Sequence, residues 1–360
     1  MKYLLIITAF FSIVSCKKST DAIVVPEAIP SNEYYFPALT GDVWDIKTAA
    51  SIGWDDAKLT EAFDFAGTKN SFGMIVLHHG KIVKEQYWNN WTTATKYALN
   101  SAGKSIVGTL VGIAQQDAIV NINNKTSTYL GVGWTSLPLI KENLITVKNQ
   151  LSMTTGLEDA VADDNCTTPA CLTYKSDAGT RWAYHNAPYR LLQDVLANAS
   201  SKPFAQYANE KLLNKIGING AVWLNYVMYC TTRDAAKFGS FILSKGKWNG
   251  SNIITDATYF NAMTNTSQNL NLSYGYLWWL NGKTSTMVPE LQTIFPVSLA
   301  SNAPADMIMA LGKDDKKIYV IPSLDVVVVR LGDSAGATSA LGPSSFDNEL
   351  WAKLKLAMRY

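Results

Sequence analysis

The pattern of apolar and polar positions predicts strands near both ends of the chain and helices between them. Residues 72–77 and 81–88 are strand-like runs joined at His79-Gly80, which is typical of a β-hairpin. Further strand-like runs lie late in the chain, at residues 274–280, 307–311, 317–321 and 326–331. The stretch from about 118 to 264 is mostly helical in character, so we expect it to form an inserted lobe.

Apolar residues at helical spacing predict helices, which cover residues 55–66, 101–116, 188–198, 232–245 and 346–358. The helix at 101–116 contains Gly103, Gly108 and Gly112, which lower helix propensity and therefore indicate close packing. The expected fold class is α+β (an α/β sandwich). One antiparallel sheet is built from the N- and C-terminal strands and flanked by helices, with the helical lobe beside it.

The first sixteen residues have the pattern of a secretory signal. Lys2 precedes a mostly apolar run of twelve residues, which is too short to span a bilayer. The run ends at Cys16 in a context that resembles the lipobox of bacterial lipoproteins. We therefore expect a signal peptide at 1–15, a lipidated Cys16 with a tether over 16–37, and one large domain over 38–360. Such a protein is exported and anchored to a bacterial membrane, in the periplasm or at the cell surface.

Export changes how the remaining cysteines are interpreted. Cys166 and Cys171 lie five apart in a polar stretch and can close a small disulfide loop, whereas Cys230 lies among apolar residues and is expected to be a buried thiol. The chain has only three histidines, and none is spaced with the cysteines as a zinc site requires. We expect no metal and no other cofactor.

Composition bounds the function further. Charged residues make up 17% of the chain, against about 25% in an average globular protein, so a large core is expected. The 31 Lys and Arg residues nearly balance the 29 Asp and Glu residues, and no basic cluster stands out. Nucleic acid is therefore not an expected partner.

The pattern Ser-x-x-Lys occurs three times, at Ser15/Lys18, Ser101/Lys104 and Ser244/Lys247. Signal cleavage destroys the first, and the third spans the predicted end of a helix. Only Ser101 begins an apolar helix, where a three-residue spacing places it and Lys104 on one face. The free N–H groups of a helix start also suit an oxyanion. On this local pattern alone, a nucleophile with its base and an ordinary helix-start serine with a solvated lysine both remain open.

Two other motifs fail on their requirements. Residues 332–336 fit a nucleophile elbow around Ser334, but that arrangement needs a later histidine, and none follows His185. Residues 103–105 imitate the end of a phosphate-binding loop, but the required earlier glycine falls at Ala98. We reject both.

Seven ordered segments together resemble the serine β-lactamase and penicillin-binding protein superfamily. They are residues 73–81, 101–104, 145–157, 179–186, 231–239, 274–279 and 318–322. The closest likeness is to C-type β-lactamase-like esterases, peptidases and amide hydrolases, and it runs from about residue 35 to 351. It implies a β-lactamase/DD-peptidase-like fold and an acyl-enzyme formed on Ser101.

The resemblance also selects among four Tyr-x-Asn patterns, at Tyr87, Tyr184, Tyr207 and Tyr259. Tyr184 alone follows a glycine-containing approach loop and precedes a helix, as the catalytic tyrosine of the family does. Its neighbour Asn186 is then expected to hydrogen-bond the substrate and Lys104. Lys104 and Tyr184 form a coupled pair, and the sequence leaves open which of them is the base.

A third family motif, Lys-Thr-Gly or His-x-Gly, lines the site from a strand. By order, its counterpart is Ala310-Leu311-Gly312, although Lys283-Thr284-Ser285 is closer in letters. With the first choice, the N–H groups of Ser101 and Lys313 form the oxyanion hole.

Ala310 supplies no cation for a substrate carboxylate, which favours ester or amide hydrolysis. The expected substrate is thus a small-molecule or peptide-like ester or amide, and the expected membrane contact is the lipid anchor. A D-Ala-D-Ala carboxypeptidase, a β-lactamase and a catalytically silent penicillin-binding-like module remain alternatives.

Overall fold

The computed structural model describes residues 34–336 and 343–360. The expected signal peptide, Cys16 and most of the tether lie outside the described residues. The packed unit spans Tyr34–Tyr360. At its start, the Tyr35 N–H donates to the carbonyl of His79 in the first hairpin.

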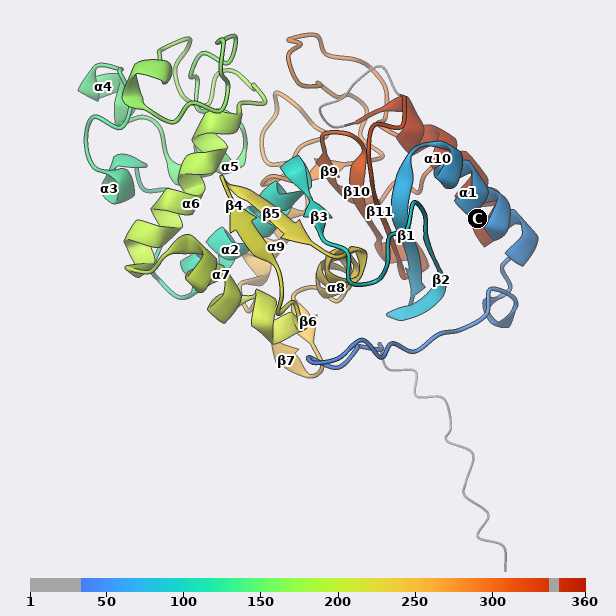
Figure 1. The fold of residues 1–360 in the computed structure, drawn as a ribbon. Coiled ribbons are helices and arrows are strands. Elements are labelled where there is room, and N and C mark those ends of the chain that lie inside the picture. Colours follow the sequence, from blue (N-terminus) through green and yellow to red (C-terminus); the bar gives the residue numbers. More distant parts are fainter. Residues whose placement is uncertain (1–33, 337–342) are drawn as a thin grey trace, which may run out of the picture. The chain divides into compact units, whose positions relative to one another are not determined.

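A six-stranded sheet joins the two ends of the chain (Figure 1). Its order is β2-β1-β11-β10-β9-β8, and all of its described pairings are antiparallel. The strands are β1 (Ser71–His78), β2 (Lys81–Tyr87), β8 (Trp279–Leu280), β9 (Ile308–Gly312), β10 (Lys316–Ile321) and β11 (Val326–Gly332). Because β1 pairs directly with β11, the predicted sheet built from both ends is confirmed.

Helices cover both faces of this sheet. On β10, Ile318 lies under α8 (Thr232–Leu243), where a Cβ added to Gly239 would come within 3.3 Å of it. The next residue, Tyr319, points to the other face and meets Trp351 of α10 (Ser345–Met358), with ring centroids 5.6 Å apart. Adjacent strand residues face opposite sides, so α8 and α10 are on opposite faces. The first helix, α1 (Asp56–Thr68), packs against α10.

Most of the remaining helices and short strands lie within residues 118–264, the expected helical lobe, but α8 of the same range covers the sheet instead. The helices not yet described are α2 (Gly103–Gln116), which precedes that range, and α3 (Ser127–Leu130), α4 (Leu139–Glu142), α5 (Val147–Leu151), α6 (Asn186–Ser200), α7 (Phe204–Lys211) and α9 (Ala257–Met263). A small sheet of β3 (Tyr97–Ala98), β5 (Val227–Cys230) and β4 (Val222–Leu224), and a hairpin of β6 (Lys247–Trp248) and β7 (Ser251–Asn252), were not predicted. Short 3-10 turns occur at η1 (Ala50–Ile52), η2 (Asn100–Ala102), η3 (Pro169–Cys171), η4 (Leu213–Ile216) and η5 (Pro322–Leu324). Within the described ranges, none of the helices has the length and apolar character needed to cross a bilayer.

The strand predicted at 274–280 is wrong over most of its length. Only Trp279–Leu280 is a strand, because the chain turns back on itself just before it. The Gly275 N–H donates to the carbonyl of Trp278 at 2.8 Å, and Leu277 takes a positive φ of 62°. All seven residues are buried, so the apolar run arises from their burial and does not indicate an extended conformation.

Close packing around α2 is confirmed at two of its glycines. A Cβ on Gly108 would lie 2.8 Å from the carbonyl oxygen of Tyr276, and one on Gly112 would lie 2.3 Å from the ring of Tyr259. The helix is buried on all sides from Gly103 to Ala114. Small residues therefore let α2 run through the centre of the molecule.

Gly112→Ala should lower the free energy of unfolding by about 1–3 kcal/mol, because the new methyl group overlaps the Tyr259 ring. Gly103→Ala is the matched control on the same helix, since the nearest atom to its new Cβ is 3.9 Å away. Without a clash, alanine is the better helix former, and the control should be neutral or slightly stabilising. Denaturant titration of both variants measures the difference, and equal stabilities would contradict the packing argument.

Candidate active site

Ser101 and Lys104 meet at the start of α2. Ser101 lies in the 3-10 turn η2 and Lys104 in the first turn of the helix that follows. The Lys104 Nζ donates to the Ser101 Oγ at 2.9 Å. Ser101 is half-buried, whereas Lys104 is only 3% exposed. The local spacing that singled out this pair therefore does bring the two side chains into contact.

The Lys104 amine lies in a largely aromatic environment. Its Nζ is 5.0 Å from the ring centroid of Tyr184 and 4.3 Å from that of Tyr189, and it donates to the Asn186 Oδ1 at 2.7 Å. In the described part of the chain, no carboxylate lies within ion-pair distance of this amine. Burial therefore lowers the pKa of Lys104 from 10.5 to about 7, even though the negative charge of Asp164 acts to raise it.

Tyr184 reaches the same point from the end of an extended segment, two residues before Asn186 begins α6. Burial raises the pKa of its hydroxyl, while the neighbouring Ser101 acts to lower it. Its ring is stacked on Trp279 of β8 at a centroid distance of 5.7 Å. Burial thus disfavours the charged form of both groups, so Lys104 is partly neutral at pH 7 while Tyr184 keeps its proton.

The end of β9 lies against the turn that carries Ser101. A Cβ on Gly312 would be 2.3 Å from the Leu99 carbonyl oxygen and 3.0 Å from the Ala102 nitrogen, so only glycine permits this approach. The Asn100 Nδ2 donates to the Lys313 carbonyl at 3.1 Å and ties the two segments together. Gly312, the last residue of the segment 310–312, therefore lies against the turn that contains Ser101.

Lys283 lies elsewhere. It lines a separate cavity of about 730 Å³ between the ends of α8 and α9, together with Lys245 and Lys247. Of the two segments considered for the third motif, only the one at 310–312 reaches the turn that contains Ser101.

Ser101 opens onto a cleft of about 620 Å³. Its lining includes Ser101, Lys104, Tyr184, Asn186, Asp159, Asp164, Arg190, Glu290 and Lys313. Asp159 is paired with Arg181 at 2.6 Å. Trp182, Trp278 and Trp279 are buried in the core and do not line this cleft.

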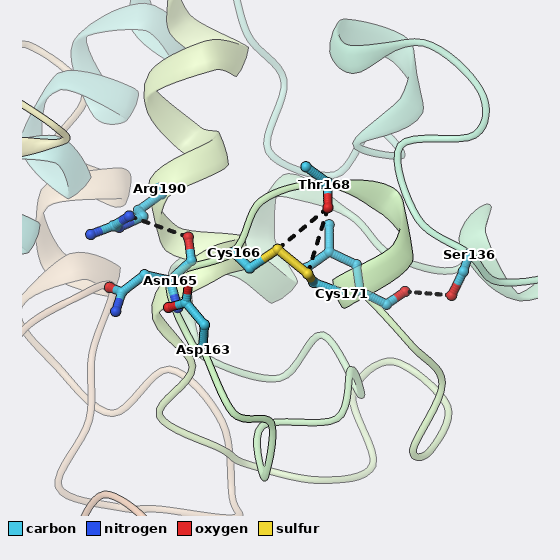
Figure 2. Close-up of a disulfide and its surroundings, with 8 residues drawn as sticks. Ser136, Asp163, Asn165, Cys166, Thr168, Cys171 and Arg190 are labelled. Carbon is cyan, nitrogen blue, oxygen red and sulfur yellow. Dashed lines mark hydrogen bonds between the residues drawn. A yellow bond between two sulfur atoms is a disulfide. The ribbon is translucent and has the colours of Figure 1, made fainter.

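Sequence reasoning missed Asp164. The Asn186 Nδ2 donates to its Oδ2 at 2.6 Å, which connects the Lys104–Asn186 contact to a surface loop. Two residues after Asp164, a disulfide joins Cys166 to Cys171 (Figure 2), while Cys230 is buried as a free thiol. The polar stretch around Asp164 carries no periodic signal, so nothing in it distinguishes this aspartate from its neighbour Asp163.

The histidines take no part in the cleft. His78 ends β1, His79 pairs with Asp325 in the following turn, and His185 is buried beside Tyr184. Within residues 34–336 and 343–360, no three His, Cys, Asp or Glu side chains form a group that could hold a metal ion.

The Lys104→Met variant tests whether burial lowers the pKa of the Lys104 amine. Between its folded pKa of about 7 and its ordinary value of 10.5, the folded protein holds the neutral amine while the unfolded chain holds the charged one. Wild-type stability should therefore gain about 1.4 kcal/mol per pH unit from this group as the pH rises through that window. The variant lacks this gain, so its stability relative to wild type should fall steadily from pH 7 to pH 10 in urea titrations.

Ser101→Ala keeps the amine and is the control, with the wild-type pH dependence expected. If the difference in unfolding free energy between Lys104→Met and wild type does not change with pH, the pKa of the Lys104 amine is not lowered in the folded protein.

Comparison with known proteins agrees with this geometry. The β-lactamase family profile matches residues 58–337. A curated relative, an uncharacterized protein of Alkalihalophilus pseudofirmus, is 22% identical over 78% of this chain and 88% of its own length.

Solved structures show the same fold. A Bacteroides dorei protein described as a β-lactamase superposes with a TM-score of 0.66 at 15% identity, over 85% of this chain and 100% of that one. A Bacillus anthracis protein described as a 6-aminohexanoate-dimer hydrolase gives 0.64 at 16% identity, over 82% and 80%. With the family profile spanning most of its length, the chain belongs to the β-lactamase family and has the serine hydrolase fold of that family.

Proposed function

We propose that this protein is a serine hydrolase that cleaves an ester or amide bond through an acyl-enzyme on Ser101. The observation that carries the proposal is the hydrogen bond that the Lys104 amine donates to the Ser101 hydroxyl in an open cleft, which Ser101, Lys104 and Tyr184 all line. A serine hydroxyl is a weak nucleophile unless an adjacent group takes its proton. Here the adjacent amine is partly neutral at pH 7 and can do so.

The protonation states favour Lys104 as the proton acceptor and Tyr184 as the proton donor. Neutral Lys104 accepts the proton of Ser101 as its Oγ attacks the substrate carbonyl. Tyr184 keeps its proton and is placed to pass it to the leaving alcohol or amine. Water then attacks the acyl-enzyme, with proton transfers in the reverse sense. The N–H groups of Ser101 and Lys313 stabilise the oxyanion, and losing one such donor typically costs about 10²–10³ in rate.

The substrate class follows from what lies beside Gly312. Ala310 is buried and supplies no cation, so an uncharged ester or a linear amide is favoured. The similarity to a protein described as a 6-aminohexanoate-dimer hydrolase supports including linear amides. A substrate with a carboxylate, such as a β-lactam or a D-alanyl peptide, is the second candidate, because the exposed Lys313 lines the cleft next to Gly312.

Wild-type protein should react with a fluorophosphonate at Ser101 and hydrolyse short p-nitrophenyl esters. Ser101→Ala should abolish both, and Tyr184→Phe should lower kcat/KM by about 10²–10⁴. The value of kcat/KM should rise with pH through about 7, because the base must be neutral and the pKa of Lys104 lies there. Ser244→Ala removes the serine of another Ser-x-x-Lys pattern and should leave activity unchanged.

The substrate panel should also contain a chromogenic cephalosporin, a D-Ala-D-Ala peptide and linear amides. Faster turnover of the cephalosporin than of the esters would reverse the order of the two candidates. Folded protein that takes no fluorophosphonate label would be a catalytically silent module, and the hydrolase proposal would fail.

We further propose export and acylation at Cys16, supported by the apolar run of residues 3–14 that precedes it. Full-length protein expressed in a bacterium should incorporate an alkyne-tagged fatty acid and sediment with membranes. Cys16→Ala should lose the tag and leave the membrane fraction. A tag retained by that variant would place the lipid elsewhere.

A further inference from the structure

The two ends of the Asn186 amide have different partners. Its Oδ1 accepts a hydrogen bond from the Lys104 Nζ at 2.7 Å, and its Nδ2 donates to the Asp164 Oδ2 at 2.6 Å. An ionised carboxylate only accepts hydrogen bonds, so Asp164 requires the NH₂ end of the amide to face it. The oxygen of the amide is thereby turned toward the lysine.

Asp164 is itself held in place. Its second oxygen, Oδ1, accepts from the Asn165 Nδ2 at 2.8 Å, so both carboxylate oxygens have donors. Figure 2 shows Arg190 of α6 contacting the same loop next to the disulfide, where its Nη1 donates to the Asn165 carbonyl at 3.2 Å. Asn186 and Arg190 lie one turn apart on α6. The loop is thus fastened to the helix that begins with Asn186.

We propose that Asp164 is a positioning residue of this active site, which holds the Lys104 amine against the Ser101 Oγ by fixing the orientation of the Asn186 amide. This inference rests on the proposed hydrolase function, and it identifies a residue outside the three family motifs. Without the carboxylate, the amide is free to rotate and present its NH₂ end to the amine, which breaks the contact that orients Lys104.

Asp164 also acts on Lys104 through its charge. The groups around the amine are the rings of Tyr184 and Tyr189, the Asn186 amide, and the charges of Asp164 and Arg190. Burial lowers the pKa of Lys104, the Asp164 carboxylate raises it and Arg190 lowers it. Removing the carboxylate therefore shifts the titration of Lys104 to lower pH, an effect that a purely structural role would not produce.

Three variants separate these contributions. Asp164→Ala removes both acceptor and charge, and should slow fluorophosphonate labelling of Ser101 at pH 8 by about 10- to 100-fold, the value of a hydrogen bond to a charged group. Asp164→Asn keeps an acceptor for the Asn186 NH₂ and should recover most of that rate. Both should move the acidic limb of the labelling rate to lower pH. Asp163→Asn, an exposed neighbour, is the matched control and should behave as wild type.

A second readout does not depend on reactivity. The titration of Lys104, followed by NMR with ¹³C-labelled lysine and assigned by Lys104→Met, should move to lower pH in Asp164→Asn relative to wild type. Unchanged titration together with unchanged labelling in Asp164→Ala, with the fold verified by thermal unfolding, would overturn the inference. If wild-type protein takes no label but the Lys104 titration still moves to lower pH in Asp164→Asn, the proposed hydrolase function is refuted. The coupling between Asp164 and Lys104 then stands.

Discussion

The burial of the Lys104 amine constrains how the helices and strands around it can pack. Lys104 is almost fully buried among tyrosine rings, and desolvation of a charged group is costly unless the group becomes neutral. A helix that holds a lysine in this way must itself be enclosed on all sides. Gly108 and Gly112 permit that enclosure, because the backbone of Tyr276 and the ring of Tyr259 approach where a side chain would otherwise stand.

The enclosure also explains why the site lies where the sheet meets the lobe. Ser101 and Lys104 come from the start of α2, Asn186 from the start of α6, and Gly312 from the end of β9. The contact between Lys104 and Asn186 spans 82 residues of sequence, and the one between Asn100 and Lys313, the neighbours of Ser101 and Gly312, spans 213. The site therefore exists only when the strands from both ends of the chain have closed the sheet, since β9 approaches η2 from within it.

Sequence reasoning predicted those parts that have a local pattern. The hairpin turn, the β-branched runs of the last strands and the helical spacing in α2 and α10 are all local signals, and of the three Ser-x-x-Lys patterns the resemblance selected Ser101/Lys104, whose side chains are in contact. Complete burial removed the signal at 274–280, because an apolar run without alternation fits a turn as well as a strand. Asp164 has no such pattern, since its role depends on a contact with Asn186 across 22 residues and on how the disulfide loop packs on α6.

One physical cause accounts for the protonation states that the proposed reaction needs. Burial disfavours charge on any group, so it lowers the pKa of the Lys104 amine and raises that of the Tyr184 phenol. An amine near neutrality is a proton acceptor, and a phenol that keeps its proton is a donor. The same desolvation that reduces the stability of the fold at neutral pH thus favours the base and the acid that the proposed reaction needs near Ser101. Asp164 opposes this effect of burial, because its negative charge acts to raise the pKa of the Lys104 amine. It does so without forming an ion pair with the amine.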